Sequence, residues 1–371
     1  MYSESDLANA IEAGVLTPAQ ADAFRNHVAE GRHTPAVDEE HFRLLTGFND
    51  IFVAIATVLI LVAVGWIGFY IGGQIFNIER EGPVEIGASV ACGAATVAIT
   101  SWLLAEYFTR QRRMALPSIL LLLGFSGGVL AASGALFGAN APWLAEQFNA
   151  VTDVQREQLG GGIAAIVGII TAAATYVHWK RFMVPITVAV GAVTAVGIAI
   201  GMIMAFFPAM RDWTNPVVLV AGVIVFAVAM GWDGSDLERR TRRSDVAFWL
   251  HLAAAPLIAH PIFHMLGVFD GDISIPMAMI VLALYVVFAI VALAIDRRAL
   301  LVSSLVYVLY AMYSLFESTG AVELSAALTG LVIGSALLML SAFWQPMRRG
   351  VVGLLGGLGG SLPPTQQVVT A

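Results

Sequence analysis

Apolar runs of about 20 residues recur from Phe52 almost to the end of this chain. A transmembrane helix needs about 20 consecutive apolar residues to cross the hydrocarbon core of a bilayer, so these runs restrict the possible folds more than any other feature does. The sequence is 58% hydrophobic and 12% charged, whereas ordinary soluble domains contain about 25% charged residues. The sequence therefore predicts an all-α, polytopic membrane helical bundle.

Ten spans are expected, each with an uncertainty of about 2–4 residues at its boundaries. They cover residues 51–72, 85–107, 115–138, 160–179, 182–207, 216–232, 247–267, 274–295, 299–316 and 321–344. The longest loop between them, from Ala139 to Leu159, mixes apolar and polar residues and is expected to form an amphipathic helix at the membrane interface.

The positions of Lys and Arg predict the orientation of the bundle, because cytoplasmic loops carry an excess of both. With a cytoplasmic N-terminus, 16 of the 19 cationic side chains fall in cytoplasmic segments, and the exceptions are Arg80, Arg156 and Arg211. The tryptophans lie at or near span ends or in a loop, as aromatic belts do. We therefore expect both termini to be cytoplasmic.

Three regions follow from these spans. Residues 1–47 are predicted to be a cytoplasmic helical hairpin and linker, 48–346 the transmembrane bundle, and 347–371 a Gly-rich, flexible cytoplasmic tail. In the hairpin, Thr17 and Gln20 flank Pro18 in the pattern of a capping box. The hairpin is interpreted as a cap on the bundle or, alternatively, as a contact surface for a protein partner.

A 5+5 inverted repeat is a further hypothesis, because transporters often have that construction. Asn49 precedes Gly65-Trp66 by 16 residues, and Asn215 precedes Gly231-Trp232 by the same number. Such matches also arise by chance in a chain rich in glycine and apolar residues.

The seventh span carries three histidines, His251, His260 and His264, together with two prolines. Ionisable groups at membrane depth are costly and usually face a bundle interior or a wet cavity. His260 and His264 share one helix face and are candidates for metal binding or proton handling, while His251 lies nearly opposite. A metal site would need more ligands, for which Asp270 and Asp272 are candidates. Ordinary hydrogen bonding between helices is the alternative.

Other polar residues complete the set of candidates. Tyr307, Tyr310 and Tyr313 place hydroxyl groups on a face of the ninth span that is expected to point into the bundle, where they suit a solute pathway or interhelical hydrogen bonds. A basic loop is a candidate contact for an anion or lipid headgroup, or else a topology signal; it contains Arg239, Arg240, Arg242 and Arg243. Ser244 and Asp245 are expected to cap the following helix.

Two stretches carry a resemblance to a known family. The first is Gly14-Val15-Leu16-Thr17-Pro18-Ala19-Gln20-Ala21, followed by Arg43 and Gly47-Phe48-Asn49-Asp50. The second is Arg242-Arg243-Ser244-Asp245-Val246-Ala247-Phe248-Trp249-Leu250-His251. The chain resembles a family of bacterial predicted membrane proteins classed as a domain of unknown function. The resemblance implies a bacterial inner membrane and implies no activity, so no site residue comes from it.

The leading functional hypothesis is a transporter-like protein that moves a small solute or lipid. The alternatives are a metal-binding or proton-handling membrane enzyme centred on His260 and His264, and a non-catalytic accessory or scaffold protein. No phosphate-binding loop, dinucleotide fingerprint, zinc-protease helix or nucleophile elbow occurs. No catalytic residue is assigned and no cofactor is expected. The expected partners are the lipid bilayer, a small solute and a protein at the hairpin, and nucleic acid is not expected.

Overall fold

A computed structural model describes residues 4–32, 48–76, 82–237, 239, 241–268, 274–318, 324–356 and 362–363. Within these ranges the secondary structure is helical, which confirms the predicted all-α class. The α-helices are α1 (Glu4–Glu12), α2 (Pro18–Arg32), α3 (Phe48–Phe76), α4 (Pro83–Ala105), α5 (Ala115–Ala139), α6 (Ala141–Gln147), α7 (Asp153–Phe182), α8 (Ile186–Phe206), α9 (Thr214–Gly234), α10 (Arg242–Met265), α11 (Ile275–Ile295), α12 (Ala299–Ser318), α13 (Ser325–Ala342) and α14 (Trp344–Leu355). A π-helical segment, Glu106–Gln111, extends α4, and a 3-10 segment, Pro208–Trp213, precedes α9.

Ten of these helices in the described part of the chain are long and apolar enough to cross a membrane. They are α3, α4, α5 and α7 to α13, and each overlaps one of the ten predicted spans. The chain is therefore a multi-pass integral membrane protein. Large apolar side chains such as Leu59, Trp66 and Leu338 remain exposed on the bundle surface, which suits contact with lipid tails.

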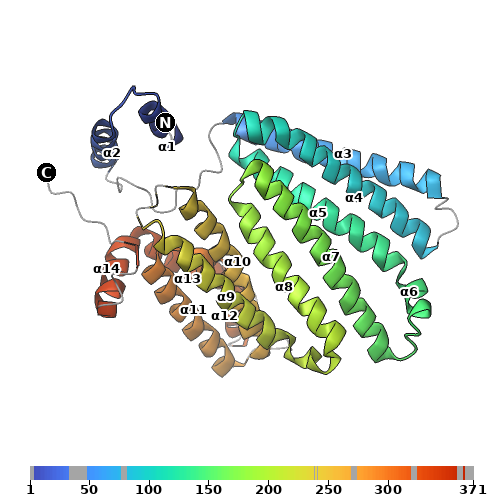
Figure 1. Ribbon diagram of the computed structural model, residues 1–371. Coiled ribbons are helices and arrows are strands. Elements are labelled where there is room, and N and C mark those ends of the chain that lie inside the picture. The colour runs from blue at the N-terminus through green and yellow to red at the C-terminus, as the bar shows by residue number, and fades with distance from the viewer. Residues whose placement is uncertain are drawn as a thin grey trace.

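The spans form two groups (Figure 1). In the first, α3, α4, α5, α7 and α8 lie side by side, and each packs on the next one along the chain. In the second, α10 packs on α9 and α12, while α11 packs mainly on α12. The contact between α8 and α10 joins the groups. Since α3, α4 and α5 all contact one another, the neighbour relations of the two groups differ, and the inverted repeat stays a prediction.

Small residues bring neighbouring helices close together. Gly161 of α7 lies against the backbone of Gly201 and Ala205 in α8, and Gly128 of α5 lies against that of Ala94 in α4. Close approach of this kind is the usual packing of membrane helices, which gain van der Waals contact instead of a hydrophobic driving force.

Local capping follows the sequence in some places and departs from it in others. Thr17 and Gln20 form the predicted capping box, with each side chain bonded to the backbone N–H of the other. At α10 the prediction was wrong: the N-cap is Thr241, whose hydroxyl accepts from the Arg243 N–H. Ser244 is displaced from that role because it is buried beside Arg297.

Two segments differ from the expected loops. The predicted interfacial helix between 139 and 159 is reduced to α6, because a capping box of Thr152 and Gln155 starts α7 at Asp153. The predicted flexible tail from 347 instead begins within α14. This helix forms because Trp344 and Val351 pack with residues of α11 and α12, which compensates for its glycines.

Candidate functional site

The connection between α11 and α12 places charged residues inside the bundle. Directly after the apolar α11 come Asp296, Arg297 and Arg298. Asp296 is the C-cap of α11 and adopts a left-handed backbone conformation with φ 58°. Within this turn Asp296 and Arg297 are each only 2% exposed, whereas Arg298 is exposed.

Arg297 is the centre of a first buried group, the Asp233 cluster, which consists of Asp233, Ser244, His251 and Arg297. Its guanidinium binds the Asp233 carboxylate through two bonds, Nη2 to Oδ1 at 2.5 Å and Nε to Oδ2 at 3.2 Å. His251 Nε2 donates to the same Oδ2 at 3.0 Å. Arg297 Nη2 also donates to the Ser244 carbonyl at 3.3 Å. The cluster thus joins the end of α9, the first half of α10 and the start of α12.

Asp296 is the centre of a second group, the Asp296 cluster, with Arg239, Trp344 and Arg348. Arg239 Nη1 lies 3.0 Å from Oδ2, and Trp344 Nε1 donates to Oδ1 at 2.8 Å. Arg348, fully buried on α14, places its Nε 3.5 Å from Oδ1. This cluster fastens α14 and the α9–α10 loop to the α11–α12 turn.

Burying the charged groups of both clusters costs desolvation free energy. Two opposite charges lose their hydration on burial, and their attraction restores that loss only when the remaining hydrogen bonds are made. Asp233 meets this condition with three donors from two side chains. His251 does so only in part, because its Nδ1 has no hydrogen-bond partner among the described protein groups.

The structure separates the three histidines of the seventh span. His251 belongs to the Asp233 cluster, while His260 and His264 lie at the other end of α10 with exposed side chains. His260 Nδ1 is hydrogen-bonded to the Tyr307 hydroxyl at 2.8 Å, and His264 Nδ1 lies 3.0 Å from Asn215 Nδ2. His251 therefore has a different set of partners from His260 and His264.

Among the described residues, no third candidate ligand accompanies His260 and His264 to form a metal site. Their ring centroids are 6.0 Å apart. No group of three or more His, Cys, Asp and Glu residues suited to a metal ion occurs among the described residues. Asp270 and Asp272, the candidate extra ligands, lie outside those residues.

The tyrosines of α12 do not all face the bundle interior as expected. Tyr307 stacks on the buried Phe263 at a centroid distance of 4.3 Å, but Tyr310 and Tyr313 are exposed. The reason is their spacing of three, which shifts each successive side chain by about 60° around the helix.

The arginines of the basic loop also lie in different environments. Arg239 enters the Asp296 cluster, Arg242 and Arg243 are exposed, and Arg240 lies outside the described residues. A surface anion contact therefore has Arg242 and Arg243 available, while Arg239 is committed to a buried carboxylate.

Sequence reasoning did not assign Asp233, Asp296, Arg297, Trp344 or Arg348 to a site. Asp233 is the last residue but one of the apolar α9, and Arg297 follows the apolar α11 after a single turn residue, Asp296. A carboxylate or guanidinium in that position is at membrane depth if the helix continues, and this continuity is the signal that could have identified them.

His178, a buried histidine of α7, was also not singled out by sequence reasoning. It is fully buried within an aromatic group of Trp102, Phe125 and Phe182, with ring centroids 6.0, 5.4 and 4.6 Å away. Neither of its ring nitrogens has a hydrogen-bond partner among the described protein groups.

The fold and the two clusters define the class: a multi-pass helical membrane protein with a buried charge network at one end of its second helix group. No family model matches the chain, and neither the curated proteins nor the solved structures include one that is similar to it.

Proposed function

We propose that this protein is a transporter-like protein of the bacterial inner membrane, with both termini in the cytoplasm, and that it moves a small solute or lipid. In this proposal the Asp233 cluster closes the cytoplasmic end of a pathway between α9, α10 and α12. The observation that carries the proposal is the meeting of Asp233 of α9, His251 of α10 and Arg297 of the α11–α12 turn in one buried group.

The cost of this group supports a functional role. Replacing a buried ion pair with well-packed apolar residues is often neutral or stabilising, so a bundle that served as an anchor alone has no need of one. Ionisable residues inside membrane bundles mark solute pathways and proton relays more often than passive structure.

The two ends of the α9–α10 hairpin are held differently. At one end the buried Asp233–Arg297 pair ties α9 to the start of α12. At the other end, Asn215 of α9 and His264 of α10 share an exposed hydrogen bond, and water or lipid headgroups readily replace a bond of that kind. This difference supports a state that is closed at the arginine-rich end and that opens when the ion pair separates.

A cysteine-accessibility experiment tests the proposal. Cys92 is first replaced with Ser, and Ala254, which is fully buried one turn deeper in α10 than Leu250, is replaced with Cys. Everted membrane vesicles are then treated with a membrane-impermeant maleimide. We expect R297Q to raise labelling of the new cysteine several-fold, because the separated ends admit water.

The matched control is R298Q, which removes the same charge from the next residue, an exposed arginine that stacks on Trp344. It should leave labelling unchanged. If the R297Q protein elutes as a folded monodisperse species and its cysteine stays unlabelled, the cluster is a static fastening and the proposal fails. H251Q provides a milder second variant if R297Q does not accumulate.

A further inference from the structure

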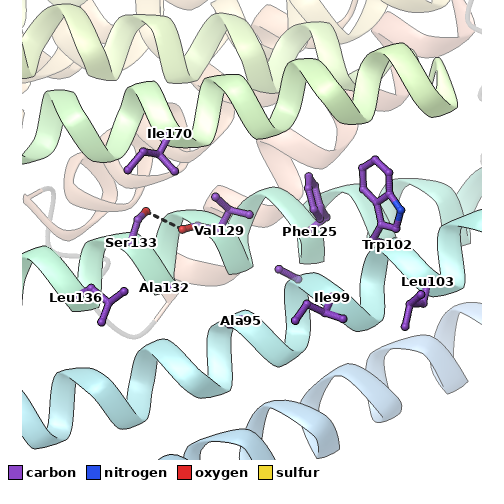
Figure 2. A pocket seen from close by; sticks show the side chains of 11 residues that line it. Ala95, Ile99, Trp102, Leu103, Phe125, Val129, Ala132, Ser133, Leu136 and Ile170 are labelled. Atoms are coloured by element: carbon purple, nitrogen blue, oxygen red, sulfur yellow. Dashed lines mark hydrogen bonds between the residues drawn. The ribbon is translucent and has the colours of Figure 1, made fainter.

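An apolar groove runs along the first helix group, away from both charged clusters (Figure 2). It lies between α4, α5 and α7 and has a volume of about 460 Å³. Its walls include Ile99 and Trp102 of α4, Phe125 and Leu136 of α5, and Ile170 of α7. Figure 2 shows Trp102 and Leu103 at one end of the groove and Leu136 at the other.

The position of this groove determines what can fill it. Ile99, Leu103 and Leu136 are exposed along its edge, and they belong to helices that cross the membrane. The groove therefore opens onto lipid tails and not onto water. From Phe125 to Leu136 it extends about 16 Å along α5, which is roughly half the ~30 Å thickness of a hydrocarbon core. These dimensions suit a lipid acyl chain.

One end of the groove leads to a basic surface. Leu103 is one turn from Glu106, which begins the π-helical segment after α4. Glu106 pairs with Arg181 at 2.7 Å and with Arg110 at 3.4 Å. Arg112, Arg113 and Lys180 are exposed near the same ends of α4 and α7. Among the described residues at these ends of α4 and α7, five cations accompany the Glu106 carboxylate, and this excess of positive charge lies at the level of lipid phosphates.

The aromatic end of the groove is fixed before any ligand arrives. Trp102 and Phe125 both pack on the buried His178, with interplanar angles of 83° and 30°. Ring packing of this kind holds the wall in one arrangement, so an entering chain does not have to order it.

We propose that this groove binds an anionic phospholipid, with one acyl chain between α4, α5 and α7 and the phosphate beside Arg110, Lys180 and Arg181. The groove supplies the apolar contact, and the basic rim selects the charge of the headgroup. The site is separate from the pathway through the second helix group and holds whether or not the protein transports a solute.

Native mass spectrometry of the purified full-length protein tests this site. The protein is equilibrated with equal amounts of phosphatidylglycerol and phosphatidylcholine, and the retained lipid is counted. We expect the wild type to retain phosphatidylglycerol in preference to phosphatidylcholine. A132F places a ring in the groove, and it should lower retention of both lipids several-fold. A131F adds the same ring at the exposed neighbouring residue outside the groove, and it should change nothing.

A charge variant tests the headgroup part. R110Q/K180Q should lower the preference for phosphatidylglycerol several-fold, since it removes two of the basic side chains that attract the negative charge of the headgroup. R242Q/R243Q removes two exposed arginines outside this rim and should leave the preference unchanged.

A95F, on the facing wall of the groove, replaces A132F if that variant is unstable. Equal retention by wild type and the groove-filling variants would overturn the site, and an unchanged preference in R110Q/K180Q would overturn the anionic headgroup.

Discussion

The indole of Trp344 donates a hydrogen bond to the carboxylate of Asp296 at 2.8 Å and thereby joins the first residue of α14 to the end of α11. The same carboxylate accepts from Arg239 on its other oxygen. One buried acid therefore fastens both the α9–α10 loop and α14 to the α11–α12 turn.

Loss of that acid should be costly. We expect D296N to lower the free energy of unfolding by about 3 kcal/mol, because it removes the negative charge beside the buried guanidinium groups of Arg239 and Arg348. Thermal unfolding of the detergent-purified variant, followed by tryptophan fluorescence, measures the effect. D153N is the matched control, since the Asp153 side chain is 98% exposed, and it should cost less than about 1 kcal/mol. Equal stability of the two variants would contradict the importance of the Asp296 cluster.

The two buried histidines should respond in opposite ways to the same substitution. H178F replaces a ring with two unpartnered nitrogens among aromatic neighbours, and we expect a neutral effect or stabilisation by up to about 1 kcal/mol. H251F removes a donor from Asp233 and should destabilise by roughly 2–3 kcal/mol. Melting temperatures of both proteins in one detergent make the comparison. A large destabilisation in H178F would show that this imidazole has a bonding partner.

Neighbouring glycines of α7 provide a test of helix packing. A Cβ at Gly161 would lie 2.6 Å from the Ala205 nitrogen, whereas one at Gly162 would meet nothing within 4 Å. G161A should therefore destabilise by about 1–3 kcal/mol through overpacking. G162A should stabilise by about 0.5–1 kcal/mol, because alanine loses less backbone entropy in a helix. The prediction fails if both variants shift the unfolding midpoint in the same direction.

Reporter fusions test the proposed orientation. Alkaline phosphatase is active only outside the cytoplasm, so a fusion after Asn149 should be active and one after Ser235 inactive. A green fluorescent protein series at the same two positions should give the reverse pattern. Phosphatase activity at Ser235 would place the arginine-rich loop in the periplasm and would remove the proposed cytoplasmic gate.

The sequence was sufficient to predict the ten spans, because a bilayer imposes length and apolarity on every crossing segment independently of the others. The capping box of Thr17 and Gln20 was predictable for a similar reason, since both partners lie within one turn. Each of these features depends on residues that are near one another in the chain.

The charged clusters could not be derived in this way. Asp233 meets Arg297 across 64 residues and His251 across 18, and no local pattern specifies which helices become neighbours. The same limit explains α14. Trp344 ends the tenth predicted span and Val351 lies in the Gly-rich tail, and only the position of α11 brings them into one apolar cluster. Among the histidines, position on the helix separated His251 from the others, but its partner depended on the packing of α9.

Asp296 also shows how a single residue can serve two incompatible preferences. Its backbone lies in the left-handed region at φ 58°, where glycine is favoured for steric reasons. A glycine there would relieve the backbone strain, but it would also remove the carboxylate that Trp344 and Arg348 of α14 contact. A substitution chosen only to relieve backbone strain would thus weaken the attachment of the C-terminal helix. A search for stabilising substitutions that scores only dihedral angles would choose the wrong residue at this turn.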